Sequence, residues 1–181
     1  MLILASASPR RHELLLAAGI GHVVQPTSIP EIRLPGEPPV EFVRRLAEEK
    51  AQAATRASDD TVLAADTVVC LDDEVLGKPQ DDPDAVRMLR CLSGRDHWVH
   101  TGICLLSRHR RIVDVATTQV SFVQLTEDEI QEYTQSGEPR DKAGAYAIQG
   151  RASKYVCSIR GCYHNVVGLP VSLVYRYLKS L

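Results

Sequence analysis

One stretch decides the fold of this chain: residues 61–71, which read Thr-Val-Leu-Ala-Ala-Asp-Thr-Val-Val-Cys-Leu. A nearly unbroken apolar run rich in valine is typical of a strand that is covered on both faces. Before it, apolar residues recur near the 3.6-residue period over residues 40–57, which predicts a long helix. After it, residues 74–76 form another short strand. The stretch therefore predicts a buried strand of an α/β domain.

Further elements follow outward in both directions. Strands are expected at residues 2–5, 22–25, 98–107 and 112–123, and helices at 8–19, 82–92 and, with Thr126 and Glu129 as a capping box, 126–137. A hairpin around Arg160-Gly161 is expected over residues 154–167, an irregular segment over 138–150, and a C-terminal helix from Pro170. Because strands and helices interleave, we expect one α/β domain over residues 1–181, with a mixed, strongly twisted sheet flanked by helices.

Composition narrows the classes of function. The 181 residues carry a net charge of -2 and only 5% aromatic residues, which argues against a nucleic-acid partner. The five cysteines are odd in number and have no Cys-x-x-Cys spacing, which favours a reducing cytoplasm over a disulfide framework or a zinc site. No stretch approaches the ~20 apolar residues of a membrane span, and the N-terminus lacks the pattern of a signal peptide. We expect a soluble, cytoplasmic protein without a membrane partner.

The stretch Ser6-Ala7-Ser8-Pro9-Arg10-Arg11 lies between a strand and a helix. Backbone N–H groups at such a helix start favour an anion. Ser8 also serves as an N-cap and Pro9 as the first helical residue, but that explanation leaves the two arginines unexplained, since cations there oppose the helix dipole. We therefore predict a phosphate site, and we expect replacement of Arg11 by alanine to cost little folding free energy.

A carboxylate inside an apolar strand is costly unless it is paired or binds a metal. Asp66 is thus a candidate general base or Mg²⁺ ligand, or else a satisfied buried carboxylate. Lys78, between a glycine and a proline, can be aimed at a ligand, although loop lysines are usually solvated. An exposed helix face explains Lys50 better than a function does. His97 and His100 do not suit a metal pair on a strand, so we expect exposed polar residues.

The segment from Asp141 to Gly150 reads Asp-Lys-Ala-Gly-Ala-Tyr-Ala-Ile-Gln-Gly. Small residues let a backbone approach a ligand closely, while Lys142 and Gln149 supply polar contacts. A tight, packed loop explains the segment equally well. The chain has no Gly-x-x-x-x-Gly-Lys-Ser/Thr loop and no Gly-x-Ser-x-Gly elbow, which argues against a P-loop enzyme and an α/β-hydrolase.

Together these stretches resemble the Maf family of nucleotide pyrophosphatases. The ordered motifs run from residue 2 to residue 170, and they are LASASPRR at 4–11, ADTVV at 65–69, LGKP at 76–79, LSG at 92–94, DKAGAY at 141–146, IQG at 148–150 and VVGLP at 166–170. The resemblance implies two lobes around a deep nucleotide-binding cleft, as in related house-cleaning pyrophosphatases. It also implies a Mg²⁺ or Mn²⁺ cofactor, often a homodimer, and a link to arrest of septum formation.

The resemblance also assigns roles to residues. It places catalysis or binding at a set of positions that match this chain: Ser6, Arg10, Arg11, Glu31, Lys50, Asp66, Lys78 and Gln149. Asp66 matches the proton acceptor, and Asp66 with Glu31 would hold the metal. We add Ser8 as a phosphate ligand and Lys142 as a substrate ligand. A water activated by Asp66 or by the metal would attack the α-phosphorus, and pyrophosphate would leave.

The family divides into branches by substrate. Arg10, Thr67 and Gln149 match the dTTP/UTP branch, whereas the 7-methyl-GTP branch tends to carry an aromatic residue, Gln and Glu there. One carboxamide can meet both the carbonyl and the N3–H of thymine or uracil, although a flipped Gln149 also suits cytosine. The alternatives are a broader or 7-methyl-GTP specificity, or a non-enzymatic nucleotide-binding regulator of septum formation, in which Asp66 would have no purpose without a metal.

Overall fold

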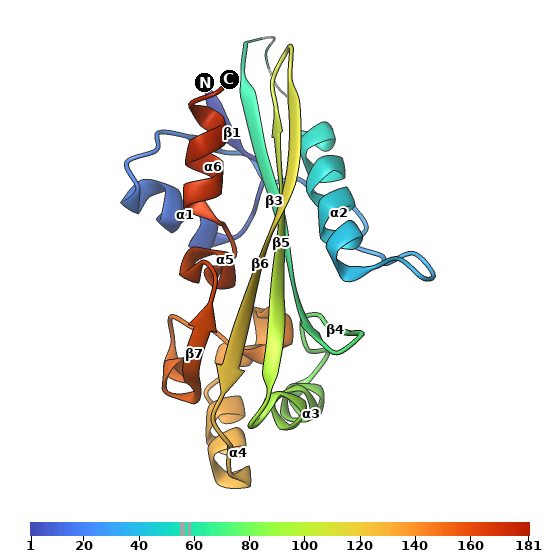
Figure 1. The fold of residues 1–181 in the computed structure, drawn as a ribbon, viewed down its shortest axis with the longest axis vertical. Coiled ribbons are helices and arrows are strands. Elements are labelled where there is room, and N and C mark those ends of the chain that lie inside the picture. The colour runs from blue at the N-terminus through green and yellow to red at the C-terminus, as the bar shows by residue number, and fades with distance from the viewer. Residues whose placement is uncertain (55–56, 58) are drawn as a thin grey trace. The chain divides into compact units, whose positions relative to one another are not determined.

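A computed structural model describes residues 1–54, 57 and 59–181 of the chain (Figure 1). Strands and helices interleave along it, as expected. In chain order the elements are β1 (Leu2–Leu4), α1 (Pro9–Ala17), β2 (Val23–Val24), α2 (Pro39–Ala53), β3 (Thr61–Leu71), β4 (Glu74–Leu76), α3 (Asp82–Leu92), β5 (Asp96–Leu106), β6 (Arg111–Phe122), α4 (Glu127–Gln135), the 3₁₀ helices η1 (Glu138–Asp141), η2 (Ala143–Ala145) and η3 (Arg151–Tyr155), β7 (Val156–Arg160), α5 (Tyr163–Val167) and α6 (Val171–Leu178).

Within the described residues the strands form one seven-stranded mixed sheet, in the order β2-β1-β3-β5-β6-β7, with β4 paired to β3. β1 is parallel to both β2 and β3, whereas β4 and β7 are antiparallel to their partners. β3 spans the predicted residues, and nine of its eleven residues are buried. The predicted α/β fold with a mixed sheet is therefore confirmed.

The chain divides into two compact units. Unit 1 comprises Met1–Thr67, Thr101–Ala116 and Gly168–Leu181, and unit 2 comprises Val68–His100 and Thr117–Val167. Three long strands, β3, β5 and β6, contribute residues to both units. The cleft that the resemblance implies stays a prediction.

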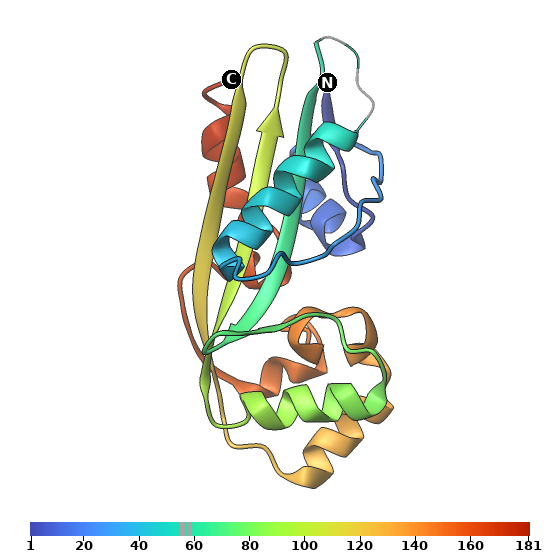
Figure 2. The same cartoon turned by 90° about the vertical axis from the view of Figure 1, so that its right-hand side faces the viewer.

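Unit 1 packs helices on both sides of its strands. Figures 1 and 2 show α2 on one side, and α1 and α6 on the other. Small residues let α2 approach the sheet closely: Ala47 and Ala51 pack with Val62 and Ala64 of β3. A Cβ atom at Gly102 of β5 would lie 2.2 Å from a backbone oxygen of α2, so only glycine fits there. This close packing fixes α2, and with it Lys50, against β3.

Unit 2 is built on helices packed against short segments of sheet. α3 contacts α4, η1 and η2, and the core of unit 2 includes fully buried Leu89, Ile130, Tyr133 and Tyr155. α3 begins at Asp82 and ends before Ser93-Gly94, as predicted, with Gly94 at a φ of 67°, and Asp81, which was not predicted, is its N-cap. The capping box at the start of α4 is present as well.

Some predicted bounds and one motif are wrong. α1 ends at Ala17, β5 and β6 each begin and end one or two residues early, and α2 ends at Ala53; of its predicted last turn, residues 55 and 56 lie outside the described residues. The predicted hairpin at residues 154–167 is a strand followed by a helix, because β7 pairs with β6 and the chain then turns into α5. Among the described residues, no helix is long and apolar enough to span a bilayer.

Candidate active site

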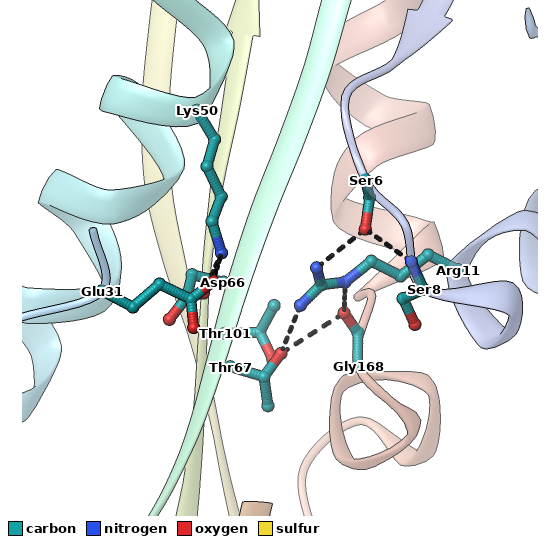
Figure 3. Close-up of polar contacts among 9 residues, drawn as sticks. All are labelled: Ser6, Ser8, Arg11, Glu31, Lys50, Asp66, Thr67, Thr101 and Gly168. Carbon is teal, nitrogen blue, oxygen red and sulfur yellow. Dashed lines mark hydrogen bonds and ion pairs between the residues drawn. The ribbon is translucent and has the colours of Figure 1, made fainter. Parts of the chain in front are cut away.

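Three predicted site residues of unit 1 meet in one cluster. Lys50 of α2 donates hydrogen bonds from Nζ to Asp66 Oδ1 at 2.5 Å and to Glu31 Oε1 at 2.6 Å (Figure 3). We call these three residues the carboxylate–lysine cluster. Lys50 and Asp66 are buried, whereas the Glu31 side chain is half exposed. The residue pattern favoured an exposed Lys50, and that expectation is wrong, since the ammonium is the counter-charge of a buried carboxylate.

The environment of Asp66 tunes its proton affinity. Burial raises the pKa of the Asp66 carboxyl above its ordinary value, while the positive charges of Lys50 and Arg11 pull it down. A carboxylate with a raised pKa accepts a proton more readily than an ordinary one, which suits a general base. The satisfied-carboxylate explanation also holds in part, because Lys50 compensates the charge.

The carboxylate–lysine cluster fits a hard divalent cation by its donor set. Two carboxylates from different parts of the chain converge on one point, which Lys50 Nζ occupies. Mg²⁺ is commonly bound through one or two carboxylates together with substrate phosphates, without a full protein cage. The described residues contain no group of three or more His, Cys, Asp or Glu side chains that could hold a metal.

A second cluster of unit 1 centres on Arg11 of α1. Its guanidinium donates to the Gly168 carbonyl at 2.8 Å, to Ser6 Oγ at 3.1 Å and to Thr67 Oγ1 at 3.1 Å. The Thr67 hydroxyl also lies 2.9 Å from Thr101 Oγ1. We call these five residues the arginine cluster. Burial lowers the pKa of Arg11, and the negative charge of Asp66 opposes that shift.

These contacts correct an expectation about stability. Arg11 is only 9% exposed and joins α1 to residues 67 and 168, so its removal would break three hydrogen bonds inside a buried cluster. The low cost expected for an Arg11→Ala change did not take these structural partners into account, and it stays a prediction to be measured. The first turn of α1 holds no acidic residue, as predicted, with half-buried Arg10 beside Arg11. Ser8 is the N-cap by position, but its side chain makes no cap bond, and its N–H donates to Ser6 Oγ.

The two clusters lie on opposite faces of one strand. Asp66 and Thr67 are adjacent in β3, and side chains of adjacent strand residues point to opposite faces. Figure 3 shows the carboxylate–lysine cluster beside α2 and the arginine cluster on the other side of β3. Asp66 still acts electrostatically on Arg11. Unit 1 thus combines a carboxylate that can accept a proton with a buried cation and hydroxyl groups that can meet phosphate.

The other predicted site residues belong to unit 2. Lys78 is exposed after β4, and Gln149 is exposed in a turn after η2. The two loops are joined, because Gly144 N–H donates to the Gly77 carbonyl at 3.0 Å. Lys142 donates to Asp141 and to the Glu138 carbonyl. A Cβ atom at Gly144 would lie 2.9 Å from Val69, so the packed-loop explanation of this segment holds, and it does not exclude a ligand.

His97 differs from its prediction. It is fully buried, its Nε2 lies 2.8 Å from the Tyr146 hydroxyl, and its ring packs edge-on against Phe122. Burial lowers the pKa of His97 to about 4, so the ring is neutral at pH 7. The expected exposed residue is instead an anchor for the segment that carries Gln149. His100 is partly buried and contacts Thr117.

Solved structures support the class of fold. A Ham1 protein from Staphylococcus aureus matches with a TM-score of 0.56, covering 99% of this chain and 98% of that one at 13% identity. A HAM1 protein from Coxiella burnetii matches with a TM-score of 0.53, covering 99% and 98% at 17% identity. At such low identity these matches define the fold alone, which is the mixed α/β architecture of Ham1-like proteins.

Sequence comparisons define the family. The model of the Maf family, described as Maf-like protein, matches residues 1–181, and the chain belongs to this family. Among its relatives, a protein named dTTP/UTP pyrophosphatase from Koribacter versatilis is 49% identical, over 98% of this chain and 93% of that protein. One of the same name from Geobacter sp. is 50% identical, over 99% and 95%. The resemblance that the sequence motifs indicated is confirmed.

Proposed function

We propose that this chain hydrolyses dTTP and UTP to the monophosphate and pyrophosphate. The observation that carries the proposal is Asp66, a buried carboxylate in an apolar strand that shares the Lys50 ammonium with Glu31. A site that only binds an anionic nucleotide gains nothing from such a carboxylate. The names of relatives that are about half identical over nearly the whole chain support the same substrates.

The proposed roles follow from charge and position. Asp66 accepts the proton of the attacking water, and its raised pKa favours that transfer. Lys50 holds the Asp66 carboxylate in place and offsets its charge. Ser6 and the N–H groups at the start of α1 face the phosphates, while Arg11 keeps Ser6 and Thr67 in position. The remaining proposed ligands of the substrate are Ser8, Arg10, Lys78 and Lys142.

Glu31 and Asp66 are the residues that would hold Mg²⁺ or Mn²⁺. When bound, the ion would supply positive charge beside the phosphate oxygens. Lys50 Nζ now lies between the two carboxylates. We propose that the ammonium shifts toward the phosphates when the carboxylates are engaged elsewhere. This shift would add a cation on the side where negative charge develops.

Gln149 is the residue that we propose recognises the base. Its carboxamide offers a donor and an acceptor together, which match the N3–H and a carbonyl of thymine or uracil. Arg10 or a backbone N–H that contacts the O4 carbonyl would reject cytosine. Because guanine presents adjacent donors, a glutamine suits it poorly. We expect a strong preference over purines and a weaker one over CTP.

A panel of substrates tests this proposal. We would measure kcat/KM with Mg²⁺ for dTTP, UTP, CTP, GTP and 7-methyl-GTP, following release of pyrophosphate and of monophosphate. dTTP and UTP are expected at the top. A purine at the top would overturn the assigned branch while keeping the pyrophosphatase activity, and no hydrolysis of any of them would overturn the enzymatic function in favour of a nucleotide-binding regulator.

We further propose that the protein acts in the cytoplasm as a homodimer. The odd number of cysteines, none of them in a disulfide among the described residues, supports a reducing compartment. The dimer rests on the family resemblance. Light scattering on the purified chain measures its mass in solution, and a mass near 20.0 kDa would exclude the dimer.

A further inference from the structure

The turn that carries Gln149 is held from inside unit 2. Gly150 N–H donates to the Ala147 carbonyl at 3.0 Å, which closes a four-residue turn with Gln149 exposed inside it. A side chain that reads a base must keep one direction, yet an exposed turn on its own samples several. Other residues must therefore fix the two ends of this turn.

Tyr133 of α4 fixes the first end. Its side chain is 2% exposed, and its hydroxyl accepts the Ala147 N–H at 3.1 Å. The same hydroxyl donates to Glu138 Oε1 at 2.8 Å. Burial raises the pKa of Tyr133, so the phenol keeps the proton that it donates. The start of the turn is thus tied to the core of unit 2.

Glu138 of η1 fixes the second end. Its two carboxylate oxygens lie 3.1 and 3.2 Å from the Arg151 N–H, directly after the turn. A Cβ atom at Gly150 would lie 2.3 Å from Glu138 Oε1, so the carboxylate occupies the space that any other residue would fill. One carboxylate therefore contacts both Tyr133 and the backbone that leaves the turn.

We propose that Tyr133 and Glu138 form a clamp that positions Gln149 and thereby sets the base specificity of the site. The inference rests on the proposed function. Both are positioning residues, because they act on the substrate only through the turn. A clamp that is formed before substrate arrives lowers the entropy cost of ordering Gln149 on binding. Loss of the clamp should weaken binding and base discrimination more than the chemical step.

Two clamp variants and two matched controls test the proposal. Glu138→Gln keeps the shape but removes the charge, and Tyr133→Phe removes the hydroxyl. Tyr155→Phe removes a buried hydroxyl that donates to the Glu129 carbonyl, away from the turn, and Glu132→Gln neutralises an exposed neighbour on α4. Each variant would be assayed with the best wild-type substrate of the five-nucleotide panel and with the other four.

The clamp variants should lose about tenfold in kcat/KM, mainly through KM, and their preference for the best base should narrow by a similar factor. The control variants should keep kcat/KM within about twofold of the wild-type value. In a Gln149→Ala background, the Glu138→Gln change should lower kcat/KM further by less than about threefold, because the effects of residues that act through one another are not additive.

Several results would overturn the clamp. One is unchanged KM and base preference in both clamp variants; another is a full, additive loss in the Gln149→Ala background, which would mark a general structural role. The ranking of the five nucleotides by the wild-type chain tests the proposed function separately, since the clamp variants should lose base discrimination whichever base ranks first. A wild-type chain that hydrolyses none of the five nucleotides would overturn both.

Discussion

Unit 1 buries three charged side chains, Arg11, Lys50 and Asp66, whereas the buried polar residues described in unit 2 are neutral, such as His97 and Asn165. A buried charge costs far more than a buried neutral group unless it is paired. Unit 1 meets that cost with opposite charges and backbone acceptors. Unit 2 needs only ordinary hydrogen bonds. The buried charges on which the proposed chemistry depends therefore all belong to unit 1.

Metal removal should have the largest effect. An excess of chelator should reduce hydrolysis to background, and Mg²⁺ or Mn²⁺ should restore it, because the carboxylate–lysine cluster offers hard oxygen donors. Titration of the chelated enzyme with each metal, read as pyrophosphate release, provides the measurement. Full activity in chelator would show that the charges of unit 1 suffice alone.

Asp66→Asn should lower kcat by about 100-fold or more, since a proton acceptor contributes 10²–10⁴ in rate. The amide keeps an acceptor for Lys50, so the fold should persist, which thermal unfolding checks. Asp73→Asn, an exposed change in the turn after β3, is the matched control. A variant that keeps more than a tenth of the wild-type rate would make Asp66 a structural carboxylate.

Arg11→Lys should lower the free energy of unfolding by about 1–3 kcal/mol, because one ammonium cannot reach the three acceptors of the guanidinium. Urea unfolding measures this loss. Arg87→Lys on α3, where the arginine is half exposed and pairs with Asp84 and Glu74, should change it by less than about 0.5 kcal/mol. Equal losses in the two variants would mean that Arg11 is not a structural centre.

The smallest expected effect is the contribution of His97, in unit 2, to the pH dependence of stability. The pKa of His97 is lowered to about 4 in the folded protein, so below the ordinary value of 6.5 the unfolded chain binds more protons than the folded one. Stability should therefore fall as pH falls from 6.5, by up to about 2 kcal/mol at pH 5. Urea unfolding at several pH values should show a shallower slope for His97→Gln than for wild type.

His109→Gln, at an exposed position, is the control for that comparison. It should keep the wild-type dependence of stability on pH. If His97→Gln also keeps the wild-type slope, the neutral character of His97 in the folded state is wrong, and the contrast between the two units loses its support in unit 2.

The sequence predicts those parts whose signal is local. β3, the bounds of α3 and the capping box of α4 follow from hydrophobic pattern and capping chemistry, which act within a few residues. β7 overlaps the first strand of the predicted hairpin, but its pairing with β6, about 40 residues away, and the helix α5 in place of the second strand were not predicted. The sequence also predicts the residue types of the site, since a buried Asp66 and paired arginines are costly without a function or a partner.

The partners of these site residues could not be predicted from the sequence. Gly168 contacts Arg11 across 157 residues and Thr101 contacts Thr67 across 34, and nothing near Gly168 or Thr101 in the sequence indicates that role. Gly168 lies in a family motif, but its carbonyl, which any residue carries, makes the contact. Glu138 and Tyr133 were missed for the same reason, because their hydrogen bonds are to backbone N–H groups.

In the proposed reaction, water attacks the α-phosphorus and pyrophosphate leaves. Hydrolysis of dTTP in ¹⁸O-labelled water, followed by mass spectrometry of both products, shows which phosphorus the water attacks. We expect one labelled oxygen in dTMP and none in the pyrophosphate. Label in the pyrophosphate, or release of dTDP and orthophosphate, would overturn attack at the α-phosphorus.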